Sequence, residues 1–245
     1  MVHRELAVRT FCRWLRLAGF GSLLLIFSAA RADDAFECRW AEGPITIDGV
    51  ADEADWKHAQ VIDRFTLPWL QEKARPARTA TRARLLWDRD HLYFFAEMDD
   101  ADLFADVKEH DGQTWSNDVF ELFLKPAVDK PGYYEFQVNA ANTKLDVFFP
   151  RREADGFTRF KGDGDFEFES AVQLRGTLNT RTDKDQGWSV EGRLSWNDFL
   201  RTGGRPAVGE TWTFALCRYD YSVDFDGAEL STCAPLKTKQ QADFH

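Results

Sequence analysis

A tryptophan and a carboxylate stand six residues apart in residues 114–124 (TWSNDVFELFL), a combination that suits ligand binding. If the second part of this stretch is a β-strand, Glu121 shares one face with Val119 and Phe123. The opposite face is wholly apolar, and Trp115 has the same parity as Glu121. The pattern therefore predicts an indole and a lone carboxylate on one side of a strand that is otherwise apolar on both faces.

The next predicted strand, residues 133–143 (YYEFQVNAANT), has a similar polar and aromatic face, formed by Tyr133, Glu135, Gln137 and Asn139. Such a mixture suits sugars, because the C–H faces of a pyranose stack on aromatic rings and its hydroxyls need fixed acceptors and donors. The alternative interpretation is an ordinary core tryptophan beside a partly exposed strand carboxylate.

Residues 1–32 have the pattern of a signal peptide. An apolar stretch at residues 17–30 is preceded by four arginines, Arg4, Arg9, Arg13 and Arg16, and its last residue begins the small-residue motif Ala30-Arg31-Ala32. A retained membrane anchor is the alternative, although about 14 residues interrupted by glycine are short for a membrane span. We therefore predict export to the periplasm or the medium, with residues 33–245 forming a single domain.

The charge of the chain excludes several kinds of partner. It carries 31 basic and 41 acidic side chains, and five arginines and one glutamate fall in the predicted leader, so residues 33–245 have a net charge of −14. This sign argues against nucleic acid and against anionic membrane surfaces as partners. It is compatible with neutral ligands and with bound cations such as calcium.

Three cysteines remain after the leader: Cys38, Cys217 and Cys233. In an oxidising compartment a disulfide between Cys217 and Cys233 would close the loop between two predicted strands. Cys38 would then stay free or compete for one of these partners. The spacing matches no metal-binding signature such as CxxC, so we interpret the cysteines as structural.

Short alternating runs separated by Asp, Gly and Pro predict a mostly β protein. The expected strands are residues 44–50, 81–88, 91–100, 117–126, 133–143, 144–151, 166–178, 187–196 and 212–221. The second and third of these form a hairpin, as do the fourth and fifth.

Helix is predicted only in two short segments. Residues 52–60 form a helix of one to two turns, with Asp52 as the N-cap and Trp56 facing inward, and residues 195–201 form another. Many short strands with little helix favour an all-β, antiparallel β-sandwich.

Several motifs in the same order resemble carbohydrate-binding module family 9, and in particular the stand-alone secreted family 9-like proteins of bacteria. The motifs are PITIDGVADEADW, LLWDRDHLYFFAEMDD, WSNDVFELFLKP, YYEFQVNAANTKLD, VEGRLSWNDF and GETWTFALCRYDY. The resemblance runs from about Cys38 to His245. It implies a β-sandwich with bound calcium and no organic cofactor.

The resemblance also implies a function. The expected protein is a non-catalytic module that binds a saccharide of the plant glucan or xylan type. It would support carbohydrate catabolism, with a glycoside hydrolase as a potential partner. The family pattern continues past Asp243-Phe244-His245 into a last strand, which the given sequence would lack.

The resemblance assigns binding roles to seven residues. Trp115 and Glu121 match the spacing of the family's first stacking tryptophan and a sugar-binding glutamate. The other five are Asn139, Asn142, Arg218, Tyr219 and Tyr221. The two amides fall near a polar rim position, one tyrosine would replace the second stacking tryptophan, and the arginine lies beside it. A clamp of one Trp and one Tyr is thinner than the family pattern.

Calcium is expected near Asp48, Asp99 and Asp100, because these acidic residues cluster at predicted strand ends and the family binds calcium. For Asp48, which precedes a glycine, a turn-forming role is favoured.

Three other functions remain open. Glu121 and Glu135 on neighbouring strands would suit the paired carboxylates of a glycosidase. The sandwich also resembles periplasmic haem-binding domains, for which Met98 would be the axial ligand, although its apolar neighbours Leu92, Phe94 and Ala96 favour a core position. A third alternative is an interaction module that presents Trp115 to a partner protein.

Overall fold

The computed structural model describes residues 35–126, 129–152, 154 and 166–238. The predicted leader, residues 1–32, and the end of the chain from residue 239 lie outside the described residues. Residues 38–245 form one compact unit, and the description below concerns that unit. None of its described helices has the length and apolar character needed to cross a bilayer.

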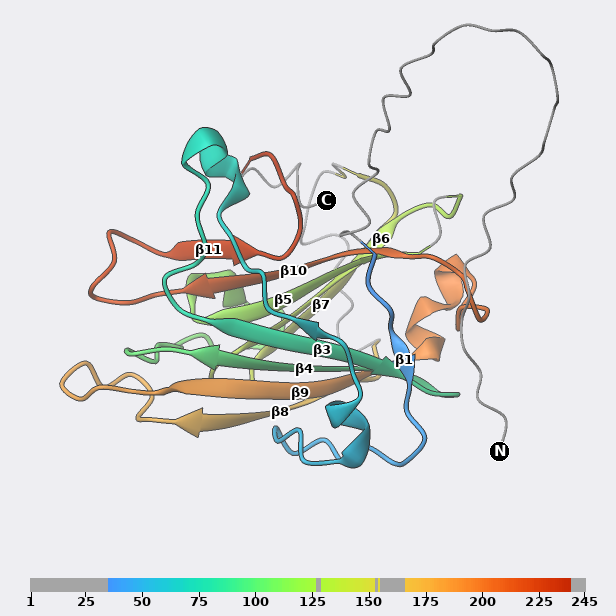
Figure 1. Cartoon of the computed structure of the whole chain (residues 1–245), viewed down its shortest axis with the longest axis horizontal. Coiled ribbons are helices and arrows are strands. Elements are labelled where there is room, and N and C mark those ends of the chain that lie inside the picture. Colours follow the sequence, from blue (N-terminus) through green and yellow to red (C-terminus); the bar gives the residue numbers. More distant parts are fainter. Residues whose placement is uncertain (1–34, 127–128, 153, 155–165, 239–245) are drawn as a thin grey trace, which may run out of the picture. The chain divides into compact units, whose positions relative to one another are not determined.

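The strands form two sheets (Figure 1). The six-stranded sheet has the order β1-β3-β4-β9-β8, with β2 paired to β3. Its strands are β1 (Arg39–Trp40), β2 (Val61–Ile62), β3 (Thr81–Trp87), β4 (His91–Asp99), β8 (Phe168–Arg175) and β9 (Gly187–Ser195). All pairs are antiparallel except β1 with β3.

The five-stranded sheet has the order β11-β10-β5-β6-β7 and is antiparallel throughout. Its strands are β5 (Val119–Lys125), β6 (Tyr133–Asn139), β7 (Lys144–Phe149), β10 (Thr213–Asp220) and β11 (Glu229–Thr232). The predicted all-β, antiparallel sandwich is therefore confirmed.

Aromatic rings fill the space between the two sheets. Phe94 of β4 stacks on Phe120 of β5, with ring centroids 6.3 Å apart, and Phe136 of β6 meets the edge of Phe168 of β8 at 5.3 Å. Met98 is fully buried in β4, as the alternation of its apolar neighbours predicts for a core residue. The inner faces of both sheets are thus fixed by apolar packing.

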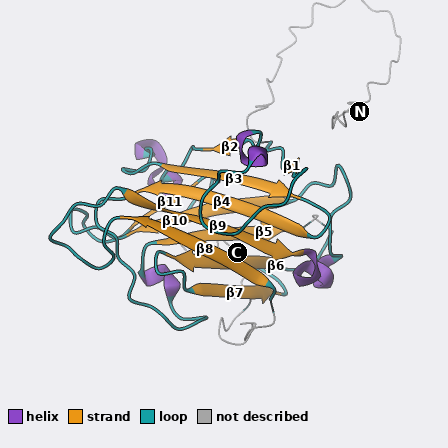
Figure 2. Cartoon of the chain, turned by 90° about the horizontal axis from the view of Figure 1, so that it is seen from below, coloured by secondary structure: helices purple, strands orange, loops and turns teal. Residues whose placement is uncertain are grey.

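In the part of the chain that the structure describes, helical structure is limited to short 3₁₀ segments, drawn purple in Figure 2. They are η2 (Ala54–Lys57), η3 (Pro68–Lys73), η4 (Thr114–Ser116) and η5 (Trp196–Thr202). The helix predicted at residues 52–60 is only η2, and Glu53, not Asp52, occupies its N-cap position. Trp56 does face inward, where its indole nitrogen donates to Glu191 at 2.9 Å.

The strand predicted at residues 44–50 is absent. Carboxylates take the backbone N–H groups that a strand partner would otherwise satisfy: Glu53 accepts from Thr46, and Glu191 accepts from Asp48 and Gly49. Asp48 itself accepts from the N–H of Val50 and forms a turn, as expected, while Gly49 adopts a φ of 89°. Local side-chain acceptors therefore replace sheet pairing here.

The predicted hairpins are confirmed. β3 and β4 pair around a turn in which Asp88 accepts hydrogen bonds from the N–H groups of Asp90 and His91, both at 2.7 Å. β5 and β6 also pair as neighbours, with Glu121 opposite Gln137. This second hairpin lies in the middle of the five-stranded sheet and supplies the central residues of the candidate site.

Candidate functional site

The outer face of the five-stranded sheet carries a pair of carboxylates. Alternation turns Glu121 of β5 and Glu135 of β6 away from the space between the sheets. The register sets Glu121 between Cys217 and Gln137, and sets Glu135 opposite Phe123. The two glutamates are therefore diagonal neighbours on adjacent strands, close enough to affect each other's ionisation.

Both carboxylates are almost completely buried, with exposures of 3% for Glu121 and 4% for Glu135. The amide of Gln137 donates to Glu135 at 2.6 Å, and its own oxygen accepts from the hydroxyl of Thr114. Burial raises the pKa of Glu135 to about 7, although the Gln137 hydrogen bond opposes the shift. Burial, assisted by the charge of Glu135, raises the pKa of Glu121 well above its ordinary value.

Half-buried aromatic side chains lie on both sides of this pair. Trp115 packs against the β6–β7 side of the face, on a cluster formed by Tyr133, Leu145, Val147 and Phe149. Tyr219 and Trp69 pack against the β10–β11 side, on a cluster formed by Phe123, Ala215, Cys217 and Leu230. The strand order β10-β5-β6-β7 thus places the carboxylates between two sets of rings.

Tyr221 connects the two sides of the site. Its hydroxyl donates to the backbone oxygen of Trp115 at 2.9 Å, and its ring lies 6.3 Å from that of Tyr219 at an interplanar angle of 24°. The turn η4 is thereby held against the end of β10. The predicted residues Trp115, Glu121, Tyr219 and Tyr221 are brought together on one side of the sheet.

Trp69 was missed by the sequence analysis, because it lies in a segment without alternation (TLPWLQE). The segment is fixed to β11 at both ends. Thr66 and Thr232 exchange two backbone hydrogen bonds of 2.9 Å, and the buried Glu229 accepts from Arg75 at 2.5 Å and from the N–H of Arg78 at 2.7 Å. A tryptophan beside a proline in an irregular segment was the only available signal.

The predicted rim amides do not belong to the site. The Asn139 side chain is buried, donates to Val107 and Asn117, and accepts from the N–H groups of Ala141 and Thr143. It therefore closes the β6–β7 turn. Asn142 occupies a left-handed position of the same turn, with φ of 60°.

The amide of Asn142 exchanges hydrogen bonds with Ser170 at the start of β8. Asn and Asp adopt left-handed conformations and close turns more readily than most residues, so a turn role explains both amides.

Arg218 is also placed differently from the prediction. It is 1% exposed and shares the inward parity of Leu216 and Asp220, so it points between the sheets. One guanidinium nitrogen donates to the backbone oxygen of Asp99 at 2.8 Å and contacts Asp100 and Asp220, each at 3.0 Å. The residue therefore joins the interior of the sandwich and is unavailable to a ligand on the outer face.

Asp118 completes an acidic cluster with Asp100 and Asp220, and all three are buried. The Asp118 carboxylate accepts from the N–H groups of Phe104 and Tyr221, both at 2.6 Å. Oδ1 of Asp220 is buried and has no hydrogen-bond partner among the described residues. Of the positions expected near calcium, Asp100 is in this cluster, whereas Asp48 forms a turn and Asp99 pairs with the exposed Arg82.

The predicted disulfide is not formed, and the thiols of Cys38, Cys217 and Cys233 are free. Cys217 of β10 lies opposite Thr232 of β11. Cys233 is the next residue along the chain, and its N–H donates to the backbone oxygen of Leu216. Cys233 lies just beyond the end of β11, and its Sγ atom accepts from the N–H of Leu216 at 3.3 Å. Burial raises the pKa of Cys233 to about 11 and keeps its thiol protonated at neutral pH.

The sequence was also compared with known protein families. The family described as carbohydrate family 9 binding domain-like matches residues 47–240. The chain belongs to this family. The resemblance inferred from the motifs is thus confirmed over most of the compact unit.

Two solved structures share the fold of this family 9 chain. A putative carbohydrate-binding protein from Bacteroides uniformis has a TM-score of 0.63 and 13% sequence identity, covering 83% of this chain and 90% of its own. A family 9 carbohydrate-binding module from Caldicellulosiruptor kristjanssonii, solved in complex with cellotriose, has a TM-score of 0.52 and 17% sequence identity. The match covers 80% of this chain and 82% of that module. No curated protein matches the sequence.

The buried pair makes the stability of this family 9 domain dependent on pH. The folded pKa of Glu135 lies above its ordinary value of 4.5, so the folded state holds a proton that the unfolded state releases between about pH 4.5 and about pH 7. We expect the free energy of unfolding to fall over this range as the pH rises. Urea unfolding at pH 5 and pH 8 measures the effect.

Glu135→Gln isolates the contribution of this carboxylate, because the amide never ionises. The variant should be more stable than the wild type at pH 8 and should show a smaller decline between pH 5 and pH 8. Glu169→Gln is the matched control, since Glu169 is 52% exposed and pairs with Arg193 on the other sheet. Equal pH dependence in wild type and Glu135→Gln would show that this carboxylate ionises freely in the folded state.

Proposed function

We propose that this family 9 domain binds a saccharide on the outer face of its five-stranded sheet, centred on Glu121 and Glu135. The observation that carries this proposal is a pair of buried carboxylates kept on an outer sheet face between half-buried aromatic rings. Burying two such groups destabilises a fold, and locally unfavourable arrangements of this kind concentrate at functional sites.

The side chains match the chemistry of a sugar ring. Trp115 on one side and Trp69 with Tyr219 on the other provide faces for the C–H groups of a pyranose. The carboxylates and the Gln137 amide provide acceptors and donors for its hydroxyls, and a carboxyl group that keeps its proton near pH 7 both donates and accepts.

The proposed ligands are β-linked glucans and xylans. The Caldicellulosiruptor module, which shares the fold, was solved with cellotriose, so cello-oligosaccharides are the first compounds to test. We further propose that the domain acts after export, in the periplasm or outside the cell, and that it supports the work of a glycoside hydrolase on the same polysaccharide.

The site is proposed to bind and not to cleave. A retaining or inverting glycosidase needs one carboxylate that stays ionised as nucleophile or base and one that keeps its proton as acid. Here burial raises the pKa of both Glu121 and Glu135, so their surroundings shift both groups in the same direction and do not divide them into an acid and a base. Binding requires no such division of roles.

The experiment is a titration calorimetry screen of glucose, cello-oligosaccharides and xylo-oligosaccharides against the wild type and Glu121→Gln. We expect binding by the wild type and weaker binding by the variant, because an amide in place of the carboxyl group changes the hydrogen-bond donors and acceptors. Reducing-end release is measured in parallel. Absence of binding to every sugar would refute the proposal, and release abolished by Glu121→Gln would show an enzyme.

Calcium is proposed to bind at Asp100, Asp118 and Asp220. The donor set fits, because it consists of carboxylate oxygens, which calcium prefers, and because the Oδ1 atom of Asp220 is buried and has no hydrogen-bond partner among the described residues. Three carboxylates also exceed the single positive charge of Arg218. A bound calcium ion would hold the ends of β4, β5 and β10 together without touching the sugar.

Chelation tests this proposal. Melting temperatures measured with added calcium and with a chelator should differ, with the calcium form melting higher, because a ligand that binds only the folded state stabilises it. Asp220→Asn should reduce the difference. Identical melting curves in the two conditions would remove calcium from this cluster.

A further inference from the structure

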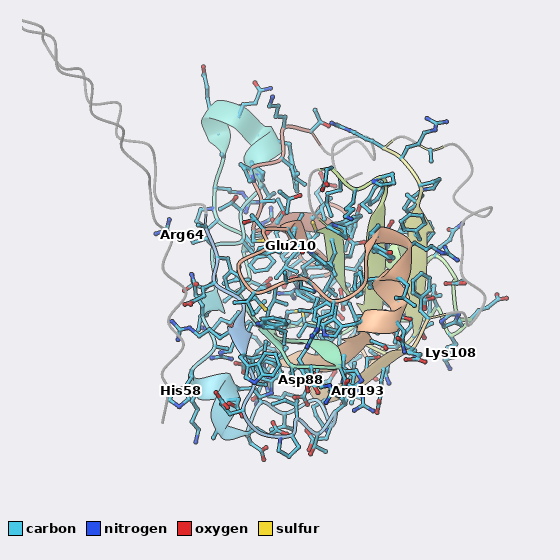
Figure 3. All side chains as sticks on the ribbon, turned by 90° about the vertical axis from the view of Figure 1, so that its right-hand side faces the viewer. His58, Arg64, Asp88, Lys108, Arg193 and Glu210 are labelled. Atoms are coloured by element: carbon cyan, nitrogen blue, oxygen red, sulfur yellow. The ribbon has the colours of Figure 1, made fainter. Side chains whose placement is uncertain are left out.

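A second cluster of potential metal ligands lies at the edge of the five-stranded sheet, away from the acidic cluster around Arg218. His110 and Asp111 come from the loop before η4, and Asp146 comes from β7. Lys108, labelled in Figure 3, marks this loop. One ligand atom from each of the three residues lies within 4.8 Å of the other two.

The backbone fixes the two aspartates. The N–H of Asp111 donates to the oxygen of Lys144 at 2.9 Å, and the Asp111 carboxylate accepts from the N–H of Asp146 at 3.2 Å. Asp111 adopts a φ of 59°, a left-handed conformation that most residues avoid. These hydrogen bonds hold the loop that contains Asp111 against β7. The carboxylates of Asp111 and Asp146 therefore lie close together.

The imidazole of His110 lies between these carboxylates. Its Nε2 atom is 3.0 Å from Oδ1 of Asp146, and its Nδ1 atom is 3.7 Å from Oδ2 of Asp111. The His110 side chain is 41% exposed, whereas the side chains of Asp111 and Asp146 are 6% and 2% exposed. The cluster thus has two buried anionic ligands and a neutral or cationic ring that opens toward solvent.

One oxygen of Asp146 has no hydrogen-bond partner among the described residues. Oδ2 of Asp146 is buried and receives no hydrogen bond from any described residue. Lys144, the nearest cation on the same strand, donates to the oxygen of Phe168 instead. A buried carboxylate oxygen is normally hydrogen-bonded or bound to a metal, so this atom points to a missing ligand.

We propose that His110, Asp111 and Asp146 bind a first-row divalent transition-metal ion, with Zn²⁺ as the test ion. One imidazole nitrogen and two carboxylate oxygens make three protein ligands, and water completes the coordination on the exposed side. The presence of an imidazole separates this site from the oxygen-only cluster at Asp100, because nitrogen ligands favour zinc and related ions over calcium.

A metal-free alternative has the same geometry. A protonated His110 would bridge the two aspartates through its two N–H groups and would form an ion pair at the sheet edge. The alternatives differ in stoichiometry, since only the metal site binds one equivalent of Zn²⁺ through these residues. They also differ in spectroscopy, since Co²⁺ in a nitrogen–oxygen site shows visible absorption bands.

The test is a calorimetric titration of the purified, tag-free protein with Zn²⁺, in excess calcium so that the oxygen-only cluster does not compete. We expect one equivalent to bind. His110→Gln and Asp146→Asn should each weaken this binding at least ~10-fold, because loss of a direct ligand should cost no less than loss of an outer-shell partner. Co²⁺ should show its visible bands in the wild type and lose them in both variants.

His91→Gln is the matched control. His91 also lies near a carboxylate, with Nδ1 3.8 Å from Asp88, but no third ligand joins this pair among the described residues, so the variant should bind Zn²⁺ as the wild type does. His110 is partly exposed, so His110→Gln should fold normally. If the wild type binds no Zn²⁺, or if His110→Gln and Asp146→Asn bind it unchanged, the cluster is an ion pair only.

Discussion

Replacing Arg218 by methionine is expected to destabilise the protein by about 3–5 kcal/mol, the cost of leaving buried charges without their partner. The guanidinium contacts Asp100 and Asp220 at 3.0 Å and donates to the backbone oxygen of Asp99. Without it, the buried carboxylates repel each other in a medium that solvates them poorly. Urea unfolding at constant pH and constant calcium measures the loss.

Arg193→Met is the control for this prediction. Arg193 also forms an ion pair, with Glu169 at 2.5 Å, but both side chains are more than a third exposed. Such pairs contribute little, so the expected change is below about 1 kcal/mol. Unfolding free energies that fall equally in the two variants would contradict the interior role of Arg218, and a folded Arg218→Met protein with weakened sugar binding would restore the rim role predicted from the sequence.

Trp115→Ala and Trp69→Ala should each weaken saccharide binding by about 1–3 kcal/mol, the loss expected for one stacked aromatic ring. The two indoles pack on opposite sides of the carboxylate pair, so the effects should be similar in sign and should combine in the double variant. Calorimetry with the sugar that binds best to the wild type gives both affinities. This prediction rests on the proposed function.

Trp40→Ala is the matched control, since Trp40 is 42% exposed but lies in β1 of the other sheet. It should bind the sugar as the wild type does. If Trp69→Ala retains full affinity while Trp115→Ala does not, only one side of the proposed site contacts the ligand. Full affinity in both variants would place the sugar elsewhere on the molecule.

The sequence predicted the elements whose pattern repeats locally. Alternation located β3 and β4 and the β5–β6 hairpin, and it assigned Glu121 and Glu135 to one face, because a period of two depends only on neighbouring residues. The family motifs added the proposed role of Trp115. The fold and the central carboxylates of the proposed site could therefore be predicted from the sequence.

Other features depend on contacts between distant residues. Arg218 follows the parity rule in β10, yet its inward direction depends on which face of that strand meets the other sheet. Asn139 shares the parity of Glu135 and was assigned to the rim from the family resemblance, but a turn formed with Thr143 uses its amide. Trp69 reaches the site because its segment is fixed by Thr232 and by Glu229, which is 160 residues further along the chain than Trp69.

Both borders of the five-stranded sheet are occupied by other parts of the chain. At one border, Thr66 exchanges two backbone hydrogen bonds with Thr232 of β11. At the other, Asp111 donates to the backbone oxygen of Lys144 and accepts from the N–H of Asp146, both in β7. Unprotected borders recruit strands from other molecules and lead to aggregation. The sheet that carries the proposed sugar site is thus protected at these positions against extension by a neighbouring copy.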